Sequence, residues 1–239
     1  MTRKELLIII PARSGSTELK NKNIVKIKNK PLIFYTCLFA NKIKNKDYQI
    51  IGSTNSKKIS KIFNQYKIKT PFIRPNIISK KYSLDISYVN HAINFFHKKN
   101  IYFKFGLILR PTSPLRDVSE FKKSFKMIKK NKNASSLKSI VLTSQTPYKM
   151  WLIKNNKIKP LLLGKKKEMY NMPRQLLPKV YFQDGGFDYF RINYKPNIKS
   201  VSGNHIIFFK RENKHLMDID SKIDLKKFRN KIENNQKTT

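Results

Sequence analysis

Short apolar runs recur along the chain, and in its first half they alternate with segments whose apolar positions follow the spacing of a helix. The runs cover residues 6–10, 48–52, 105–109, 140–143, 189–192 and 205–209. The amphipathic segments cover residues 31–43, 57–66 and 85–98. Short apolar runs are typical of strands buried on both faces, and their alternation with helices indicates βαβ units. The pattern therefore predicts an α/β fold with a mostly parallel sheet and helices on both of its faces.

This alternation is interrupted between residues 147 and 178. The segment holds Trp151, Pro160 and Pro173 together with three consecutive lysines, a composition typical of an insertion or a flap. After residue 225 helical spacing returns, and the last residues are polar. A length of 239 residues suits one domain. We therefore expect a single domain over residues 1–239 with an insertion at about 147–178.

The formal net charge of +38 raises the question of nucleic-acid binding. Lysine accounts for 43 of the 52 basic residues, whereas surfaces that read bases favour arginine for its bidentate fork. The lysines are spread over the whole chain, among abundant isoleucine and asparagine. Nucleic-acid binding is therefore the less favoured interpretation, and a polyanion-binding module stays an alternative. The positive field should attract anionic substrates.

The single cysteine, Cys37, lies in an apolar segment of helical spacing. It excludes an intrachain disulfide and favours a small buried side chain over a reactive thiol. The first apolar run is too short for the core of a signal peptide, and no stretch approaches the length of a membrane span. We therefore expect a cytoplasmic protein with no membrane partner.

The loop after the first apolar run carries the strongest local signal. Residues 11–23 begin Pro-Ala-Arg-Ser-Gly-Ser-Thr and end Lys-Asn-Lys-Asn. Small residues let the backbone approach a ligand closely, and cations balance a negative charge. Ligands of open α/β sheets bind beyond the carboxyl ends of the strands. The loop therefore predicts a site for an anion, and a phosphate fits best.

Four further segments follow the opening loop in order. They cover residues 71–75 with 83–86 and 91–92, residues 109–116, residues 172–186, and residues 217–221 with Asp224. The segment at 109–116 reads Leu-Arg-Pro-Thr-Ser-Pro-Leu-Arg, and the last one contains Asp-Ile-Asp. Over about residues 5–228 the five segments resemble the acylneuraminate (CMP-sialic acid) cytidylyltransferase family. The resemblance implies a Rossmann-like nucleotidyltransferase fold. It also implies transfer of CMP from CTP to a nonulosonate-type acidic sugar, with release of pyrophosphate, for surface glycan biosynthesis.

The resemblance assigns a nucleotide site to the opening loop and the second segment. Arg13 and Lys22 are the expected catalytic cations, because phosphoryl transfer depends on positioning and on neutralising charge. The expected nucleotide-binding residues are Arg13, Ser14, Gly15, Ser16, Lys22, Asn23, Arg74 and Asp85.

Asp218 and Asp220 are the other catalytic candidates. Alternate residues of an extended segment project to one face, so both carboxylates can meet one hard cation. This suits Mg²⁺ that bridges phosphate oxygens. The alternative is that the two aspartates cap the helix that begins near Ser221.

The resemblance also implies a sugar site and a homodimer. The expected sugar-binding residues are Arg110, Lys149, Arg174, Gln175, Asp184 and Gly185. In the family, the residues matching Lys149 and Arg174 come from the partner subunit. The insertion at 147–178 would then be a dimerisation arm.

The chain departs from the family's pattern at positions that bear on the substrate. Thr17 and Glu18 stand where the family has lysine and glycine, which removes one positive charge from the triphosphate site and adds a negative one. Arg110 replaces a glutamine that touches the sugar, and a guanidinium donates hydrogen bonds but cannot accept them. We therefore expect a divergent member whose sugar need not be N-acetylneuraminate. A nucleotidyltransferase for another sugar, or a catalytically weak nucleotide-binding relative, stays the alternative.

Four conspicuous side chains are interpreted as structural. His91 has the helical spacing of a core residue, and Tyr148 and Trp151 suit packing better than base stacking. Arg116 would hold the end of the Pro-Thr-Ser-Pro turn.

Overall fold

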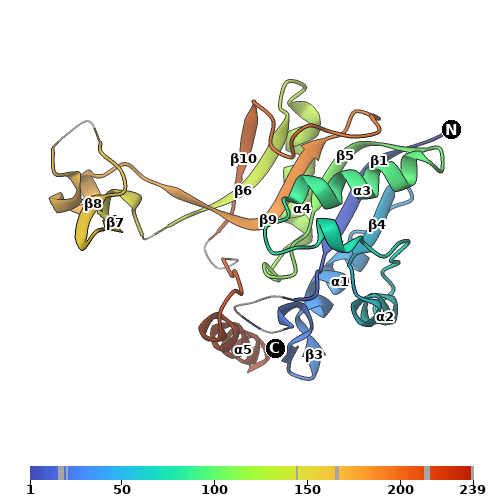
Figure 1. Cartoon of the computed structure of the whole chain (residues 1–239), viewed down its shortest axis with the longest axis horizontal. Helices are drawn as coiled ribbons and strands as arrows, with labels where there is room; N and C mark the ends of the chain where they lie inside the picture. Colours follow the sequence, from blue (N-terminus) through green and yellow to red (C-terminus); the bar gives the residue numbers. More distant parts are fainter. Residues whose placement is uncertain (16–18, 20, 144, 165–166, 213–215, 238–239) are drawn as a thin grey trace.

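The computed structural model describes residues 1–15, 19, 21–143, 145–164, 167–212 and 216–237. Its centre is a six-stranded sheet in the order β10-β6-β9-β5-β1-β4 (Figure 1). All neighbours in this sheet pair in parallel except β9, which is antiparallel to both β5 and β6. The expectation of a mostly parallel sheet is confirmed. The strands are β1 (Thr2–Pro11), β4 (Tyr48–Ser53), β5 (Ile101–Ile108), β6 (Ser136–Leu142), β9 (Tyr181–Arg191) and β10 (Ile206–Lys210).

The apolar run at the start of the chain is buried because β1 lies between two parallel neighbours and under helices on both faces. Leu6, Ile8 and Ile10 point into one apolar cluster, whereas Leu7 and Ile9 point into the other. Successive side chains of a strand face opposite sides, so only a continuous apolar run can fill both clusters.

Four helices cover the sheet, three on one face and one on the other. Three helices place side chains in the apolar cluster on one face, namely Ile33, Phe63 and Phe125. One helix places Val89 in the cluster on the other face. Helices on both faces, as expected from the sequence, are therefore confirmed. Three of these helices match the expected segments closely, and the fourth lies in a lysine-rich stretch. The four are α1 (Leu32–Lys42), α2 (Lys57–Gln65), α3 (Asp85–His97) and α4 (Val118–Lys130).

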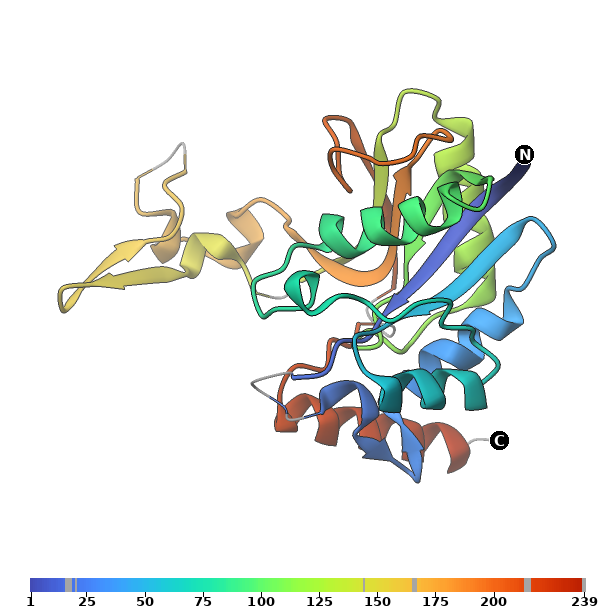
Figure 2. The same ribbon diagram turned by 45° about the vertical axis from the view of Figure 1, so that its right-hand side comes forward.

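A third, smaller cluster joins the two ends of the chain. The helix α5 (Lys222–Lys237) packs Leu225 and Phe228 against Ile27 and Leu32, beside the two-stranded pair β2 (Lys26–Ile27) and β3 (Lys30–Pro31). This contact brings the C-terminal segment against the opening loop (Figure 2). Within the described residues, none of the helices is long and apolar enough to cross a membrane.

The insertion leaves the sheet between β6 and β9 and extends away from it (Figures 1 and 2). Its core is an antiparallel hairpin of β7 (Trp151–Lys154) and β8 (Lys157–Pro160). Short 3₁₀ turns flank the hairpin at η3 (Pro147–Lys149), η4 (Met169–Asn171) and η5 (Arg174–Leu176). The chain leaves on β6 and returns on β9, which explains why β9 alone runs against its neighbours. We call residues 147–178 the arm.

Cys37 is fully buried in the first apolar cluster, under the sheet. Burial raises the pKa of its thiol to about 12, so the thiolate is not populated near neutral pH. The interpretation of Cys37 as a packed side chain is confirmed.

Candidate functional site

A polar cavity of about 230 Å³ lies at the carboxyl ends of the parallel strands β1 and β5. Its lining comes from the residues after β1, from the short turn η1 (Lys22–Ile24), from the loop before α3, and from the residues after β5. This is the edge where open α/β sheets bind ligands. The lining residues are Pro11, Arg13, Lys22, Asn23, Arg74, Ile78, Lys80, Ser83, Asp85, Tyr88, Arg110, Pro111 and Thr112.

The opening loop is held by side chains on both of its flanks. Asn23 donates from Nδ2 to the carbonyl oxygen of Arg13 at 3.0 Å, and Arg13 donates from Nη1 to the carbonyl oxygen of Gly15 at 3.2 Å. Asn55, which follows β4, accepts from the backbone N–H of Ser14 at 2.9 Å. These bonds fix the loop with the Arg13 side chain in the cavity lining.

Arg74 is a buried cation of the cavity wall. It donates from Nε to Ser53 Oγ at 3.2 Å and from Nη2 to the Ser53 carbonyl at 2.5 Å. Its guanidinium lies 4.6 Å from the centre of the Tyr88 ring. Burial lowers the pKa of Arg74 to about 10, so it stays protonated at neutral pH. A fixed cation stacked on an aromatic face is a rigid element of the site.

Asp85 and Arg110 meet at the floor of the cavity. Arg110 Nη2 lies 2.5 Å from Asp85 Oδ2. Although burial raises the pKa of this carboxyl, its bond and charge interaction with Arg110 outweigh burial, so the pKa of Asp85 lies below its usual value. The Asp85 carboxylate is thus already engaged by a side chain of its own chain.

The far end of the sequence reaches the same place. Lys22, in the cavity lining, forms an ion pair with Asp220. The backbone N–H of Ile219 donates to the carbonyl oxygen of Thr112 at 2.9 Å, which fixes the segment against the cavity wall. Burial and the neighbouring charge of Asp220 raise the pKa of Asp218. A lysine of the opening loop and a carboxylate from near the end of the chain therefore meet at the cavity.

The helix cap at this segment is made by other residues. Ser221 donates its backbone N–H to Asp224 Oδ2 at 2.9 Å, and Asp224 donates its backbone N–H to Ser221 Oγ at 3.2 Å. This reciprocal pair is a capping box at the start of α5. The alternative that Asp218 and Asp220 cap the helix is wrong, because neither carboxylate takes part in this cap.

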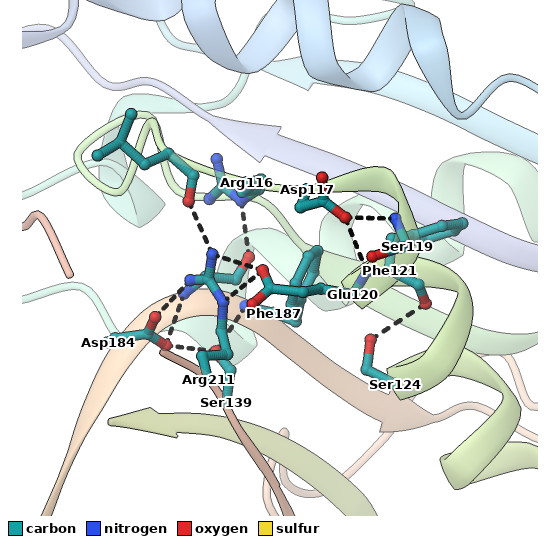
Figure 3. Close-up of polar contacts among 12 residues, drawn as sticks. Arg116, Asp117, Ser119, Glu120, Phe121, Ser124, Ser139, Asp184, Phe187 and Arg211 are labelled. Atoms are coloured by element: carbon teal, nitrogen blue, oxygen red, sulfur yellow. Dashed lines mark hydrogen bonds and ion pairs between the residues drawn. The ribbon is translucent and has the colours of Figure 1, made fainter. Parts of the chain in front are cut away.

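Asp184, expected at the sugar, lies in a buried network outside the cavity lining (Figure 3). Its carboxylate pairs with Arg211 and accepts hydrogen bonds from Ser139 Oγ and the backbone N–H of Gly186. Four residues of β9, numbers 184–187, stand opposite Ser139 alone in the ladder with β6, and this bulge turns the carboxylate inward. We therefore leave Asp184 out of the proposed sugar site.

Gly185 serves the same bulge. Its φ of 65° is the left-handed conformation that favours glycine, and a Cβ there would collide with Ser113 Oγ. Its carbonyl oxygen accepts from Arg116 Nη2 at 3.3 Å. Arg116 also donates to the carbonyl oxygens of Gly186 at 2.7 Å and Arg110 at 2.8 Å. Arg116 therefore ties the loop after β5 to the bulge, as the structural interpretation expected.

Lys149, Arg174 and Gln175 lie on the arm, in η3 and η5, and are not in the lining of the cavity. The arm points away from the sheet (Figure 1). Within one chain these three residues are therefore not brought to the site. Ser16, Thr17 and Glu18 lie outside the described residues.

Two other side chains pack as the sequence suggested. His91 meets the edge of Phe72 with ring centres 4.5 Å apart, and burial lowers its pKa. Trp151 packs on Tyr170 with ring centres 4.7 Å apart.

Several residues of the site were missed from the sequence. Tyr88 stands three residues after Asp85 on α3, a spacing that places both on one helix face and could have indicated it. Lys80 is an exposed lysine of the rim, and nothing in the pattern separates it from Lys81.

An α/β sheet with a cation-lined cavity at its carboxyl edge, in which one lining lysine pairs with an aspartate from near the end of the chain, fits a nucleotidyltransferase class of enzyme. Residues 7–237 match the sequence profile of the family described as Cytidylyltransferase. The chain belongs to this family.

Curated relatives and solved structures agree with this assignment. The chain is 26% identical to the pseudaminic acid cytidylyltransferase of Campylobacter jejuni over 182 residues, and the aligned region covers 76% of each chain. It is 28% identical over 224 residues to a CMP-N,N'-diacetyllegionaminic acid synthase of the same species, covering 93% of this chain and 92% of the relative. A CMP:2-keto-3-deoxy-manno-octonic acid synthetase solved with CTP has the same fold. It has a TM-score of 0.67 and 14% identity, over 97% of this chain and 100% of that one.

Proposed function

We propose that this enzyme transfers CMP from CTP to a nonulosonate-type acidic sugar and releases pyrophosphate, for surface glycan biosynthesis. The observation that carries the proposal is that Arg13 and Lys22 line one cavity and that Lys22 pairs with Asp220, on a segment that Ile219 fixes to Thr112 of the cavity wall. The names of the similar proteins, which act on pseudaminic and legionaminic acids, support a sugar of this class.

In the proposed reaction the anomeric hydroxyl oxygen of the sugar forms a bond to the α-phosphorus of CTP. The bond from that phosphorus to its bridging oxygen breaks, pyrophosphate leaves with the electron pair, and the hydroxyl proton passes to solvent. Arg13 and Lys22 would neutralise the phosphates, and backbone N–H groups of Ser14 and Gly15 would add donors. Arg74, fixed on Tyr88, would hold the nucleoside side. In phosphoryl transfer the protein contributes mainly by positioning the reactants and neutralising their charge.

We infer that Mg²⁺ is the cofactor and that Asp218 and Asp220 hold it. In the described part of the chain, no three His, Cys, Asp or Glu residues gather closely enough to bind a metal by themselves. Two carboxylates suffice for Mg²⁺, which usually keeps water and takes its other ligands from the substrate phosphates. Burial and the neighbouring charge of Asp220 raise the pKa of Asp218, which is consistent with two carboxylates that a cation would stabilise. When bound, the ion would neutralise charge on the phosphates.

We also infer that the enzyme is a homodimer and that the arm reaches the sugar site of the partner. The arm leaves apolar side chains in water, among them Ile153 and Leu163, which are more than 80% exposed. Exposed apolar patches of this kind mark protein interfaces. In this arrangement Lys149, Arg174 and Gln175 would act on the sugar of the other subunit. Sedimentation of the purified protein as a monomer at all concentrations would contradict the inference.

Pyrophosphate release tests the proposed activity directly. With CTP and Mg²⁺ we expect turnover of at least one acid among pseudaminic, legionaminic and N-acetylneuraminic acids and 3-deoxy-manno-octulosonate. ATP, GTP and UTP in place of CTP control for nucleotide choice. CTP binding without turnover of any acid would instead indicate a nucleotide-binding relative without this activity.

Replacing Arg13 by Ala should weaken CTP binding by ~10-fold or more, because a charged hydrogen-bond donor to the phosphates is lost. Titration calorimetry with CTP in the absence of sugar measures this. Arg3→Ala on β1 is the matched control, since Arg3 lies at the opposite end of the same strand. An equal affinity of the Arg13 variant and the wild type would remove Arg13 from the proposed site.

A further inference from the structure

Four charged side chains form a continuous row from the interior of the sheet to the cavity. Lys138 on β6 pairs with Asp188 Oδ1 on β9. Asp188 Oδ2 lies 3.0 Å from Arg110 Nη2, and the same nitrogen lies 2.5 Å from Asp85 Oδ2. Of the four residues, Arg110 and Asp85 line the cavity. We call Lys138, Asp188, Arg110 and Asp85 the charge row.

The sheet register builds the charge row. Lys138 stands directly opposite Asp188 in the ladder of β6 with β9. On its other side, β9 places Asp188 opposite Ile108, the last residue of β5. Arg110 follows two residues later. A carboxylate on the strand between them can therefore reach both cations at once.

The charge row is electrically balanced and deeply buried at its inner end. The side chains of Asp188 and Lys138 are 2% and 10% exposed, whereas those of Arg110 and Asp85 are 30% and 31% exposed. Buried charges are costly unless they are paired, and here two cations meet two anions. Neither Asp188 nor Lys138 touches the cavity, yet removing one of them would unbalance Arg110.

Arg110 keeps donors for a ligand. Both carboxylates bind its Nη2. Among the described residues, its Nε and Nη1 have no hydrogen-bond partner. These N–H groups belong to a residue of the cavity lining, so a bound substrate can take them up.

We propose that Lys138 and Asp188 are positioning residues that hold Arg110 so that it donates hydrogen bonds to an uncharged oxygen of the acidic sugar. A hydroxyl or an acyl carbonyl oxygen would fit. The proposal rests on the proposed function. The charge of Arg110 is already matched by two carboxylates, which disfavours a third anion on it. A guanidinium only donates, so the group it meets must accept.

The kinetic test compares Lys138→Met with Lys104→Met, which removes an exposed lysine from β5. We expect Lys138→Met to raise the KM for the sugar by ~10-fold, as for a weakened hydrogen bond to a charged group. The KM for CTP should stay within about twofold, and Lys104→Met should change neither. Asp188→Asn, which weakens the direct bond to Arg110, should raise the sugar KM as well. An unchanged sugar KM, or an equal rise in both KM values, would overturn the proposal.

A stability test works without turnover and so separates this proposal from the proposed function. Arg110→Gln should lower the melting temperature more in the Lys138→Met background than in the wild type, because Asp188 then loses both partners. Additive losses would show that the charge row does not couple the two cations. If the melting temperatures show coupling between Lys138 and Arg110 but the wild-type protein turns over no acidic sugar, the proposed function is contradicted and the charge row is not.

The kind of group that Arg110 meets is tested by the size of the Arg110→Gln effect. An uncharged acceptor predicts a rise of ~10-fold in the sugar KM, since glutamine still donates. A rise of more than ~100-fold would indicate that Arg110 binds the sugar carboxylate, and it would overturn this part of the proposal.

Discussion

Asp220→Asn is expected to lower kcat by ~100-fold or more while the protein stays folded. The change removes one of the two carboxylates proposed to hold Mg²⁺, and a metal ion in such a site is worth several kcal/mol of charge stabilisation. It also removes an ion-pair partner of Lys22, a cation of the proposed phosphate site. Steady-state pyrophosphate release at saturating CTP and sugar measures the effect.

The matched control is Asp224→Asn, four residues further on. Asp224 completes the capping box with Ser221 at the start of α5. Loss of a cap costs ~1 kcal/mol of stability and should leave kcat within about threefold. Wild-type kcat in the Asp220 variant, over a range of Mg²⁺ concentrations, would remove that carboxylate from the mechanism.

Arg211→Met is expected to destabilise the fold by ~3–5 kcal/mol at neutral pH, the cost of breaking a buried ion pair from one side. Arg211 is about 1% exposed and pairs with Asp184 and Glu120. It also donates to the carbonyl oxygen of Leu115 at 2.8 Å (Figure 3). Without it, the fully buried Asp184 carboxylate loses the cation it pairs with, and the loop after β5 loses one of the hydrogen bonds that hold it. Denaturant unfolding at a fixed protein concentration measures the loss.

Arg229→Met on α5 serves as the control, because Arg229 makes one exposed hydrogen bond to the backbone of Lys26. A surface change of this kind should alter stability by no more than ~0.5 kcal/mol. A loss below ~1 kcal/mol for Arg211→Met would mean that the Asp184 carboxylate finds another partner or becomes protonated.

The parts of the fold set by local pattern could be predicted from the sequence. The run at 6–10 could only be a strand buried on both faces, and the spacing at 85–98 fixed one helix within a residue of its observed end. An anion-binding site could be predicted for the loop at 11–23 because the loop itself contains the small and cationic residues that such a site needs. The meeting of Lys22 with Asp220 could be expected only because five sequence motifs, taken in order, resemble a family that uses both residues at one site.

What depends on strand register could not be predicted. Asp184 was expected at the sugar, but a bulge opposite Ser139 turns its carboxylate toward Arg211. Asp188 interrupts an apolar stretch, and nothing local shows that Lys138 will stand opposite it. The direction of β9 was equally hidden, because it follows from the path of the arm and not from the residues of the strand.

Leu142 and Tyr181 face each other where the arm departs, as partners in the same antiparallel ladder. A tight turn could therefore close the chain at that point and shorten it by some forty residues without moving any strand of the sheet. The arm is thus a part that can be removed or replaced without disturbing the order of the strands. The sheet and its cavity can keep the same nucleotide-binding residues while the projecting hairpin changes in length and sequence. The molecule that the hairpin contacts can change with it.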